Sequence, residues 1–226
     1  EIVNMAKRVA KFEKVTYGQF EKDWLDTFDI PELDTSTRRE IESIYGAITL
    51  PKRATKGSAG YDFVSPLTFT LKPGETIKIP TGIRCGMNTD WVLMLYPRSG
   101  LGFKYGLNLM NQTGIVDSDF YYSDNEGHIF VKLKNNGDKE CTIRRCDNVV
   151  QGIFMEYGIT EDDKVETSRN GGFGSTDRNK GWYNIEAKES NNIISNEDGA
   201  LIIINILYEQ GIINKRTYDN ILKKYK

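Results

Sequence analysis

The segment Leu71-Lys72-Pro73-Gly74-Glu75-Thr76-Ile77-Lys78-Ile79 contains a turn followed directly by a strand. Pro73 fixes its own φ and Gly74 accepts a positive φ, so Lys72–Glu75 is typical of a tight turn. The run Thr76–Ile79 contains β-branched residues, which favour an extended chain. The segment therefore predicts β structure in this part of the chain.

The same pattern extends from about Ile48 to Thr176. Clusters of Gly, Pro and Asn separate short apolar or β-branched runs, among them Thr76–Ile79, Trp91–Tyr96, His128–Leu133 and Val149–Phe154. Several short strands at this spacing favour an all-β barrel or sandwich.

The two ends of the chain have a helical period instead. Before about Gly46, Phe20, Trp24 and Phe28 recur every four residues and form one apolar face. Thr37 followed by Glu40 predicts a capping box, and Gly46 is well placed to end that helix.

A polar linker around Glu186–Asn196 precedes the second helical end. One helix is expected from Leu201 to Gly211, and another around Tyr218–Tyr225 with Asn214 as its cap. The predicted organisation is thus a helical N-terminal extension (1–47), a β core (48–177), and a linker with a helical hairpin (178–226).

Composition excludes several classes of function. Lys plus Arg number 30 and Asp plus Glu number 32, so the net charge of −2 gives no reason to expect direct nucleic-acid or membrane binding. The three cysteines form no CxxC pair, and the only histidine, His128, makes zinc sites and histidine-dependent nucleophiles improbable. His128 is more typical of a strand or loop residue. Without a long apolar run or a secretory signal, the protein is expected in the cytoplasm with reduced thiols.

Five segments combine glycines with polar residues inside this β-like region. They are Ala59–Phe63, Pro97–Gly100, Gly114–Asp119, Asp147–Gln151 and Arg169–Thr176.

The fifth segment carries the most chemical information. Glycines such as Gly172 and Gly174 let the backbone approach a ligand closely, and hydroxyls at Ser175 and Thr176 can donate to phosphate oxygens. Phe173 lies between glycines and is suited to stacking on a base.

The second and third segments add a cation and carboxylates. Arg98-Ser99-Gly100 offers a guanidinium, a hydroxyl and an exposed amide, which suit a phosphate. Asp117 and Asp119 alternate with period two, so on an extended chain both carboxylates would face the same way and one could activate water. Taken alone, each segment could equally be an ordinary turn.

In order, identity and spacing, the five segments together resemble the five motifs of the trimeric dUTPase family, from about Leu50 to Thr176. The resemblance implies a distorted jelly-roll β-barrel, a homotrimer with sites between subunits, and Mg²⁺-assisted hydrolysis of dUTP to dUMP and pyrophosphate. Such an enzyme limits uracil incorporation into DNA and supplies dUMP for dTMP synthesis. Members occur in bacteria and in phages.

The resemblance also assigns roles to the phosphate side of the site. Asp62 would hold Mg²⁺ through its water shell. Ser99, with Arg98 and the amide of Gly100, would contact the phosphates, and so would Gln151.

The remaining roles concern the nucleoside and the reaction. Asp117 would bind the deoxyribose 3′-hydroxyl and activate water, Asn111 with the backbone of Gly114 and Ile115 would read uracil, and Phe120 would pack under the sugar. The arm would clamp the substrate with Arg169, Gly172, Phe173, Gly174, Ser175 and Thr176.

The chain departs from the family pattern in four places. Phe120 replaces the usual tyrosine, Tyr121–Glu126 lengthens the hairpin after the third motif, and Asp177 stands where glycine is usual. The chain also continues well beyond the arm. A flat ring remains at Phe120, so discrimination against ribose is expected to survive.

Two other functions remain open at this stage. A dCTP deaminase shares the fold and carries its catalytic acid in a Glu-Gly segment, which Glu126-Gly127 resembles. A phage-type regulatory protein would instead use the dUTPase fold to capture a protein partner. In that case the two helical ends are candidate partner or trimer-packing surfaces.

Overall fold

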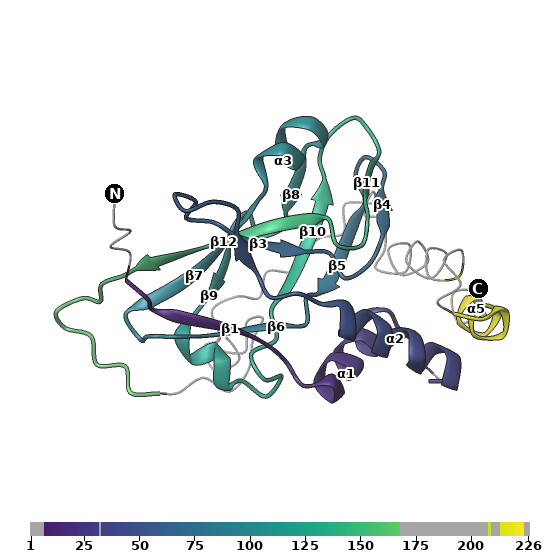
Figure 1. Ribbon diagram of the computed structural model, residues 1–226, viewed down its shortest axis with the longest axis horizontal. Helices are drawn as coiled ribbons and strands as arrows, with labels where there is room; N and C mark the ends of the chain where they lie inside the picture. The colour runs from purple at the N-terminus through teal and green to yellow at the C-terminus, as the bar shows by residue number, and fades with distance from the viewer. Residues whose placement is uncertain (1–6, 32, 168–207, 209–212, 224–226) are drawn as a thin grey trace, which may run out of the picture.

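The computed structural model describes residues 7–31, 33–167, 208 and 213–223. Its strands form four antiparallel sheets, ordered β1-β6, β5-β10-β8, β11-β4 and β2-β3-β12-β7-β9 (Figure 1). The strands are β1 (Ala10–Lys14), β2 (Lys52–Arg53), β3 (Tyr61–Val64), β4 (Phe69–Leu71), β5 (Thr76–Pro80), β6 (Ile83–Met87), β7 (Trp91–Pro97), β8 (Leu107–Leu109), β9 (Gly114–Val116), β10 (Phe130–Asn135), β11 (Cys141–Ile143) and β12 (Asn148–Glu156). The mainly β fold class expected from the sequence is confirmed.

The turn before β5 forms as predicted. Gly74 has a φ of +88°, and the Glu75 amide donates to the Lys72 carbonyl at 3.0 Å. Proline followed by a glycine at positive φ is the type II pattern.

The inward faces of the sheets form a hydrophobic core. Alternation along β7 and β12 turns Leu93, Leu95 and Val150 inward, each at most 2 % exposed. Tyr96, which follows Leu95, and Gln151, which follows Val150, therefore point outward, and Gln151 is a candidate site residue.

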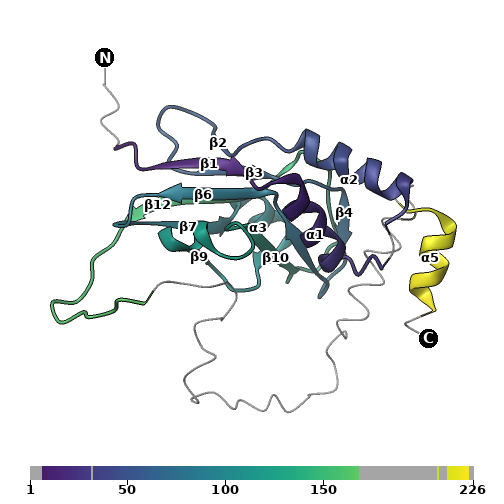
Figure 2. The same ribbon diagram turned by 90° about the horizontal axis from the view of Figure 1, so that it is seen from below.

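Residues before Gly46 are only partly helical. Helices α1 (Tyr17–Thr27) and α2 (Thr35–Ala47) are present, but residues 10–14 form β1, which pairs with β6. The expectation of helix is therefore wrong for this segment, because it adds a strand to the barrel. Both helices lie at one end of the β structure beside β5 (Figures 1 and 2).

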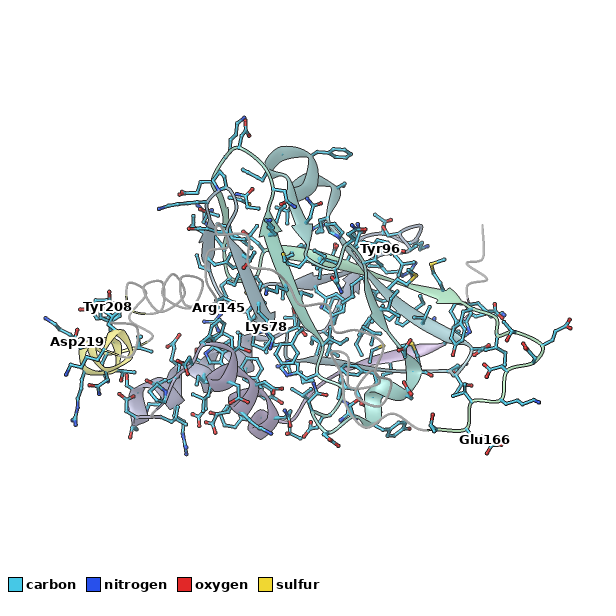
Figure 3. All side chains as sticks on the ribbon, turned by 180° about the vertical axis from the view of Figure 1, so that it is seen from behind. Lys78, Tyr96, Arg145, Glu166, Tyr208 and Asp219 are labelled. Carbon is cyan, nitrogen blue, oxygen red and sulfur yellow. The ribbon has the colours of Figure 1, made fainter. Side chains whose placement is uncertain are left out.

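The predicted apolar face of α1 is confirmed and points into the core. Phe20 and Trp24 are fully buried and Phe28 is 1 % exposed, with the Trp24 and Phe28 rings 4.6 Å apart. Arg145, just after β11, lies beside α2, and its guanidinium donates to the Ser43 carbonyl at 2.8 Å (Figure 3). The N-terminal helices therefore pack as part of the barrel core.

The predicted capping box of the second helix is wrong. Helix α2 begins at Thr35 with Asp34 as its N-cap, and the Asp34 carboxylate accepts from the Thr37 amide at 2.7 Å. That hydrogen bond lowers the pKa of Asp34. Gly46 lies within the last turn, because the helix ends at Ala47. Asp34 is a better N-cap than Thr37 because its negative charge also interacts favourably with the positive end of the helix dipole.

At the other end of the chain, α5 (Lys215–Leu222) is capped by Asn214 as predicted, with the Thr217 amide donating to Asn214 Oδ1 at 2.9 Å. Asn214 also donates to the Asp34 carboxylate, which ties α5 to the start of α2. Of the first helix of the predicted hairpin only Tyr208 is described, and its ring stacks on that of Tyr218 with the centroids 4.3 Å apart.

Within the described ranges, none of the helices is long and apolar enough to span a membrane.

Candidate active site

Three of the expected phosphate-site residues lie together on the five-stranded sheet. Asp62 of β3 and Gln151 of β12 are directly opposite in register, so their side chains leave the same face. Arg98 follows β7, and its Nε lies 3.4 Å from Asp62 Oδ1. Gln151 Nε2 donates to the Pro97 carbonyl at 3.2 Å. The first, second and fourth segments of the sequence therefore meet in space.

This cluster has the charge and exposure needed to bind an anion. The Arg98 side chain is 36 % exposed, whereas that of Asp62 is 16 % exposed. Ser99 and Gly100 are exposed at the start of α3 (Ser99–Tyr105) and add a hydroxyl and an amide. A guanidinium, a hydroxyl and a carboxamide on one side of a sheet form a set that suits phosphate oxygens.

Gly60 makes room for the carboxamide of the cluster. A Cβ added at Gly60 would lie 2.6 Å from Gln151 Oε1, which is closer than van der Waals contact allows. A side chain at Gly60 would therefore displace the Gln151 carboxamide from its present position.

The third segment forms β9 and the residues directly after it, and Asn111 lies in the turn between β8 and β9. Asn111 and Gly114 line a cavity of about 250 Å³, which also contacts Lys78 of β5 and Lys132 of β10. Burial lowers the pKa of Lys78, whose ammonium lies 4.5 Å from the centre of the Phe130 ring. The sequence prediction missed both lysines, although their alternation with apolar neighbours along each strand was the available signal.

A second cavity lies beside Ile115 of β9 and beside Asp117, just after that strand. Ile115 and Asp117 line it together with Thr89, Val92 and Tyr157, and its volume is about 480 Å³. Because successive residues of a strand face opposite sides, Gly114 and Ile115 look into different cavities. The candidate residues of this region are thus divided between the two faces of β9, with Asn111 and Gly114 at the first cavity and Ile115 and Asp117 at the second.

The expected alternation of Asp117 and Asp119 is wrong. Asp117 is the N-cap of a 3₁₀ helix, η1 (Ser118–Tyr122), so the backbone between the two carboxylates turns instead of running straight. Both residues still line the second cavity. Phe120 is 9 % exposed within η1 and lines neither cavity.

The phosphate-site cluster and β9 belong to one sheet but are separated across it. Strands β12 and β7 lie between β3 and β9. Three inter-strand steps of about 4.8 Å put Asp62 roughly 14 Å from β9. The described part of a single chain thus presents two half-sites rather than one closed pocket.

His128 lies in the loop directly before β10, as the sequence predicts, and it has a structural role. It is fully buried, with Nδ1 2.5 Å from Asp23 Oδ2 and Nε2 accepting from the Gly82 amide at 2.7 Å. The partners lie 105 and 46 residues away, so no local pattern could have revealed the pair. The three cysteines are free thiols, and burial raises the pKa of Cys85 to about 12.

The fifth segment cannot be placed relative to these clusters. Arg169, Gly172, Phe173, Gly174, Ser175 and Thr176 all lie outside the described residues, and so does Asp177. In the part of the chain that is described, no three His, Cys, Asp or Glu side chains gather closely enough to hold a metal ion directly.

The fold and the site define an antiparallel β-barrel protein whose polar site residues come from separate strands of one sheet. The dUTPase family model matches residues 47–177, more than half of the chain, and the protein belongs to the dUTPase family. The expected family membership is confirmed.

Curated relatives and a solved structure match a similar share of the chain. The deoxyuridine 5′-triphosphate nucleotidohydrolase of Lactococcus lactis subsp. lactis (strain IL1403) is 43% identical over 132 residues, covering 57% of this chain and 88% of the relative. That of Chromobacterium violaceum is 36% identical over 137 residues, covering 57% of this chain and 88% of the relative. The crystal structure of dUTPase from Streptococcus mutans is 32% identical, covers 66% of this chain and 98% of that chain, and has a TM-score of 0.47.

Proposed function

We propose that the protein is a dUTP diphosphatase that hydrolyses dUTP to dUMP and pyrophosphate. Family membership and the nucleotidohydrolase relatives support this function. The observation that carries the proposal is the meeting of Asp62, Arg98 and Gln151, because the family resemblance assigns these three residues to the phosphate side of the site.

The described residues would divide the work between charge and geometry. Arg98 and Gln151 would hold phosphate oxygens, with Ser99 and Gly100 beside them. Asn111 and the backbone of Gly114 and Ile115 would read uracil. Asp117 would bind the 3′-hydroxyl and remove a proton from the water that attacks the α-phosphorus, while Phe120 would support the sugar.

The arm residues would complete this arrangement. Arg169 would stabilise charge on the phosphates, Phe173 would stack on uracil, and Ser175 and Thr176 would donate to phosphate oxygens between the glycines Gly172 and Gly174. Closure of the arm would exclude bulk water from the reacting phosphate.

The donor set of the cluster fits Mg²⁺ that is held mainly by its substrate. Magnesium keeps several waters and is commonly bound by one or two carboxylates plus phosphates. Asp62 supplies one carboxylate, and its ion pair with Arg98 leaves it suited to accept from a metal-bound water. When bound, Mg²⁺ would neutralise phosphate charge.

A homotrimer would bring the separated half-sites together. Tyr96 lies on the outer face of the five-stranded sheet (Figure 3). The register places Met94 on the same face, with Ile115 at 56 % and Met155 at 46 % exposure. A second copy would bury this apolar face and set its own residues 111–117 beside the phosphate cluster. We therefore infer that the sites are shared between subunits. We also propose that residues 48–177 form the catalytic core and that the protein acts in the cytoplasm.

The candidate catalytic acid of the deaminase alternative, Glu126, is engaged in hydrogen bonds. Both carboxylate oxygens of Glu126 accept hydrogen bonds from Thr16, from its amide and its hydroxyl, at 2.7 Å each. A carboxylate that is engaged in this way is poorly placed to move protons at a base. The regulatory alternative stays a hypothesis, with α5 as a candidate partner surface, whereas the apolar face of α1 is used inside the core.

Pyrophosphate release from dUTP, dCTP, dTTP and UTP tests the proposal. We expect rapid release from dUTP alone with Mg²⁺ and none with EDTA, because both uracil and the missing 2′-hydroxyl are read. Comparable release from UTP would show that Phe120 does not select the sugar. Release of ammonia from dCTP would replace the proposal with the deaminase.

A further inference from the structure

The segment after the proposed catalytic aspartate is held by the N-terminal extension. The segment comprises residues 118–128, here called the third-motif loop, and the extension comprises residues 7–47. Three residues of the extension (Glu13, Thr16 and Asp23) contact three residues of the loop (Tyr121, Glu126 and His128).

The first contact fixes Tyr121 at the end of η1. Its hydroxyl donates to Glu13 Oε2 at 2.6 Å, and its carbonyl accepts from the Arg84 guanidinium at 3.3 Å. The same guanidinium stacks 3.6 Å from the centre of the Tyr121 ring. Arg84 stands directly opposite Glu13 in the register of β1 and β6. Hydrogen bonds from Lys11 and Tyr121 lower the pKa of Glu13, so it is a charged acceptor at neutral pH.

The second contact makes Glu126 a cap for α1. Thr16 is the N-cap of that helix, and its amide and hydroxyl both donate to the Glu126 carboxylate. In a capping box the third helical residue supplies this carboxylate. Here that residue is Gln19, whose amide group bonds Asp23 instead, and the loop supplies the acid from 110 positions away.

The third contact lies in the core. His128 bridges Asp23 of α1 and the Gly82 amide, and both partners are buried or nearly so. Nε2 accepts from an N–H group, so Nδ1 carries the proton and donates to Asp23. The pair fixes the end of the loop against α1.

The contacts between the loop and the extension also restrain η1. Glu126 has a φ of +57°, an unusual value for a residue with a side chain, and Gly127 has a φ of +70°. A Cβ at Gly127 would lie 2.7 Å from the Phe120 carbonyl oxygen and from Tyr121 Cα, so the loop folds directly onto η1. Contacts that fix Glu126 and His128 therefore also fix η1, which contains Phe120 and directly follows Asp117.

We propose that the N-terminal extension positions the third-motif loop for substrate binding, with Tyr121 and Glu126 as positioning residues. The proposal rests on the proposed function, because it concerns how Asp117 and Phe120 meet the deoxyribose. Both residues lie in Tyr121–Glu126, the segment that is longer than in the family pattern. The longer segment and the N-terminal extension therefore act together. Loosening the contacts between them costs binding and sugar discrimination, since both depend on the placement of η1.

A pair of Tyr→Phe variants tests this proposal. Tyr121→Phe removes the bond to Glu13, whereas Tyr45→Phe removes a bond of similar length, 2.7 Å, from Tyr45 to the Val15 carbonyl within the extension. Each variant keeps its ring and loses one phenolic hydrogen bond, but only Tyr121 lies in the loop. Glu126→Gln provides a second loop variant.

We expect amide exchange of residues 118–128 to become about tenfold faster in Tyr121→Phe, as the loss of a charge-assisted hydrogen bond predicts. The KM for dUTP should rise about tenfold with kcat changed less than about twofold, and the preference over UTP should fall. Tyr45→Phe should match the wild type in all of these measurements, and Glu126→Gln should follow Tyr121→Phe.

Unchanged exchange in both loop variants would overturn the proposal, and so would faster exchange without a change in KM. A fall in kcat and stability that is equal in Tyr121→Phe and Tyr45→Phe would reduce the contacts to a structural role and would also overturn it. A wild-type protein that fails to cleave dUTP would refute the proposed function instead, and the exchange data would still show whether the extension orders the loop.

Discussion

Asp117→Asn is expected to bind dUTP nearly as well as the wild type and to hydrolyse it about 10³-fold more slowly, because the amide cannot accept the proton of the attacking water. Asp117 lines the larger cavity at the start of η1, where the substitution keeps the shape of the side chain. Single-turnover rates with excess enzyme and calorimetric binding of a non-hydrolysable analogue separate the two effects.

Asp124→Asn is the control for this prediction, since Asp124 is an exposed acid in the following loop. It should behave as the wild type in both measurements. Turnover by Asp117→Asn within about tenfold of the wild type would remove Asp117 from the role of base.

Trp24→Ala is expected to lower the free energy of unfolding by about 3–5 kcal/mol, the usual loss for a buried large aromatic. Trp24 is fully buried, with its ring 5.3 Å from Phe20 and 4.6 Å from Phe28. Its indole N–H has no hydrogen-bond partner among the described residues, so the loss comes from packing alone. Thermal unfolding should show one transition, lowered by roughly 10 °C.

Lys22→Ala, on the exposed side of the same helix, should leave the transition within about 2 °C of the wild type. Two separate transitions in the wild type, with only one of them shifted by Trp24→Ala, would show that the extension folds independently of the barrel. That result would contradict the shared core.

Local chemistry explains the parts of the fold that the sequence predicted. The Pro73-Gly74 turn depends on two backbone preferences, and the α1 face depends on a spacing of four residues. Both are properties of adjacent residues. β1 was missed because a five-residue strand at the edge of a helical region has too few residues to reveal a period of two.

Long-range pairing explains what the sequence could not predict. The family resemblance supplied Asp62 and Gln151, but their position opposite each other follows from the register of β3 and β12, which no local signal encodes. The capping of Thr16 by Glu126 joins residues 110 positions apart. Asp117 and Asp119 do not alternate as on an extended chain, because η1 begins between them. A helix this short has no periodic pattern that the sequence could reveal.

Hydrolysis of dUTP in H₂¹⁸O, with mass analysis of both products, tests the central claim most directly. Attack of water on the α-phosphorus predicts dUMP that carries one ¹⁸O atom and pyrophosphate that carries none. Label in pyrophosphate, or formation of dUDP with inorganic phosphate, would contradict the account, because the bond broken would then not be the one at the α-phosphorus.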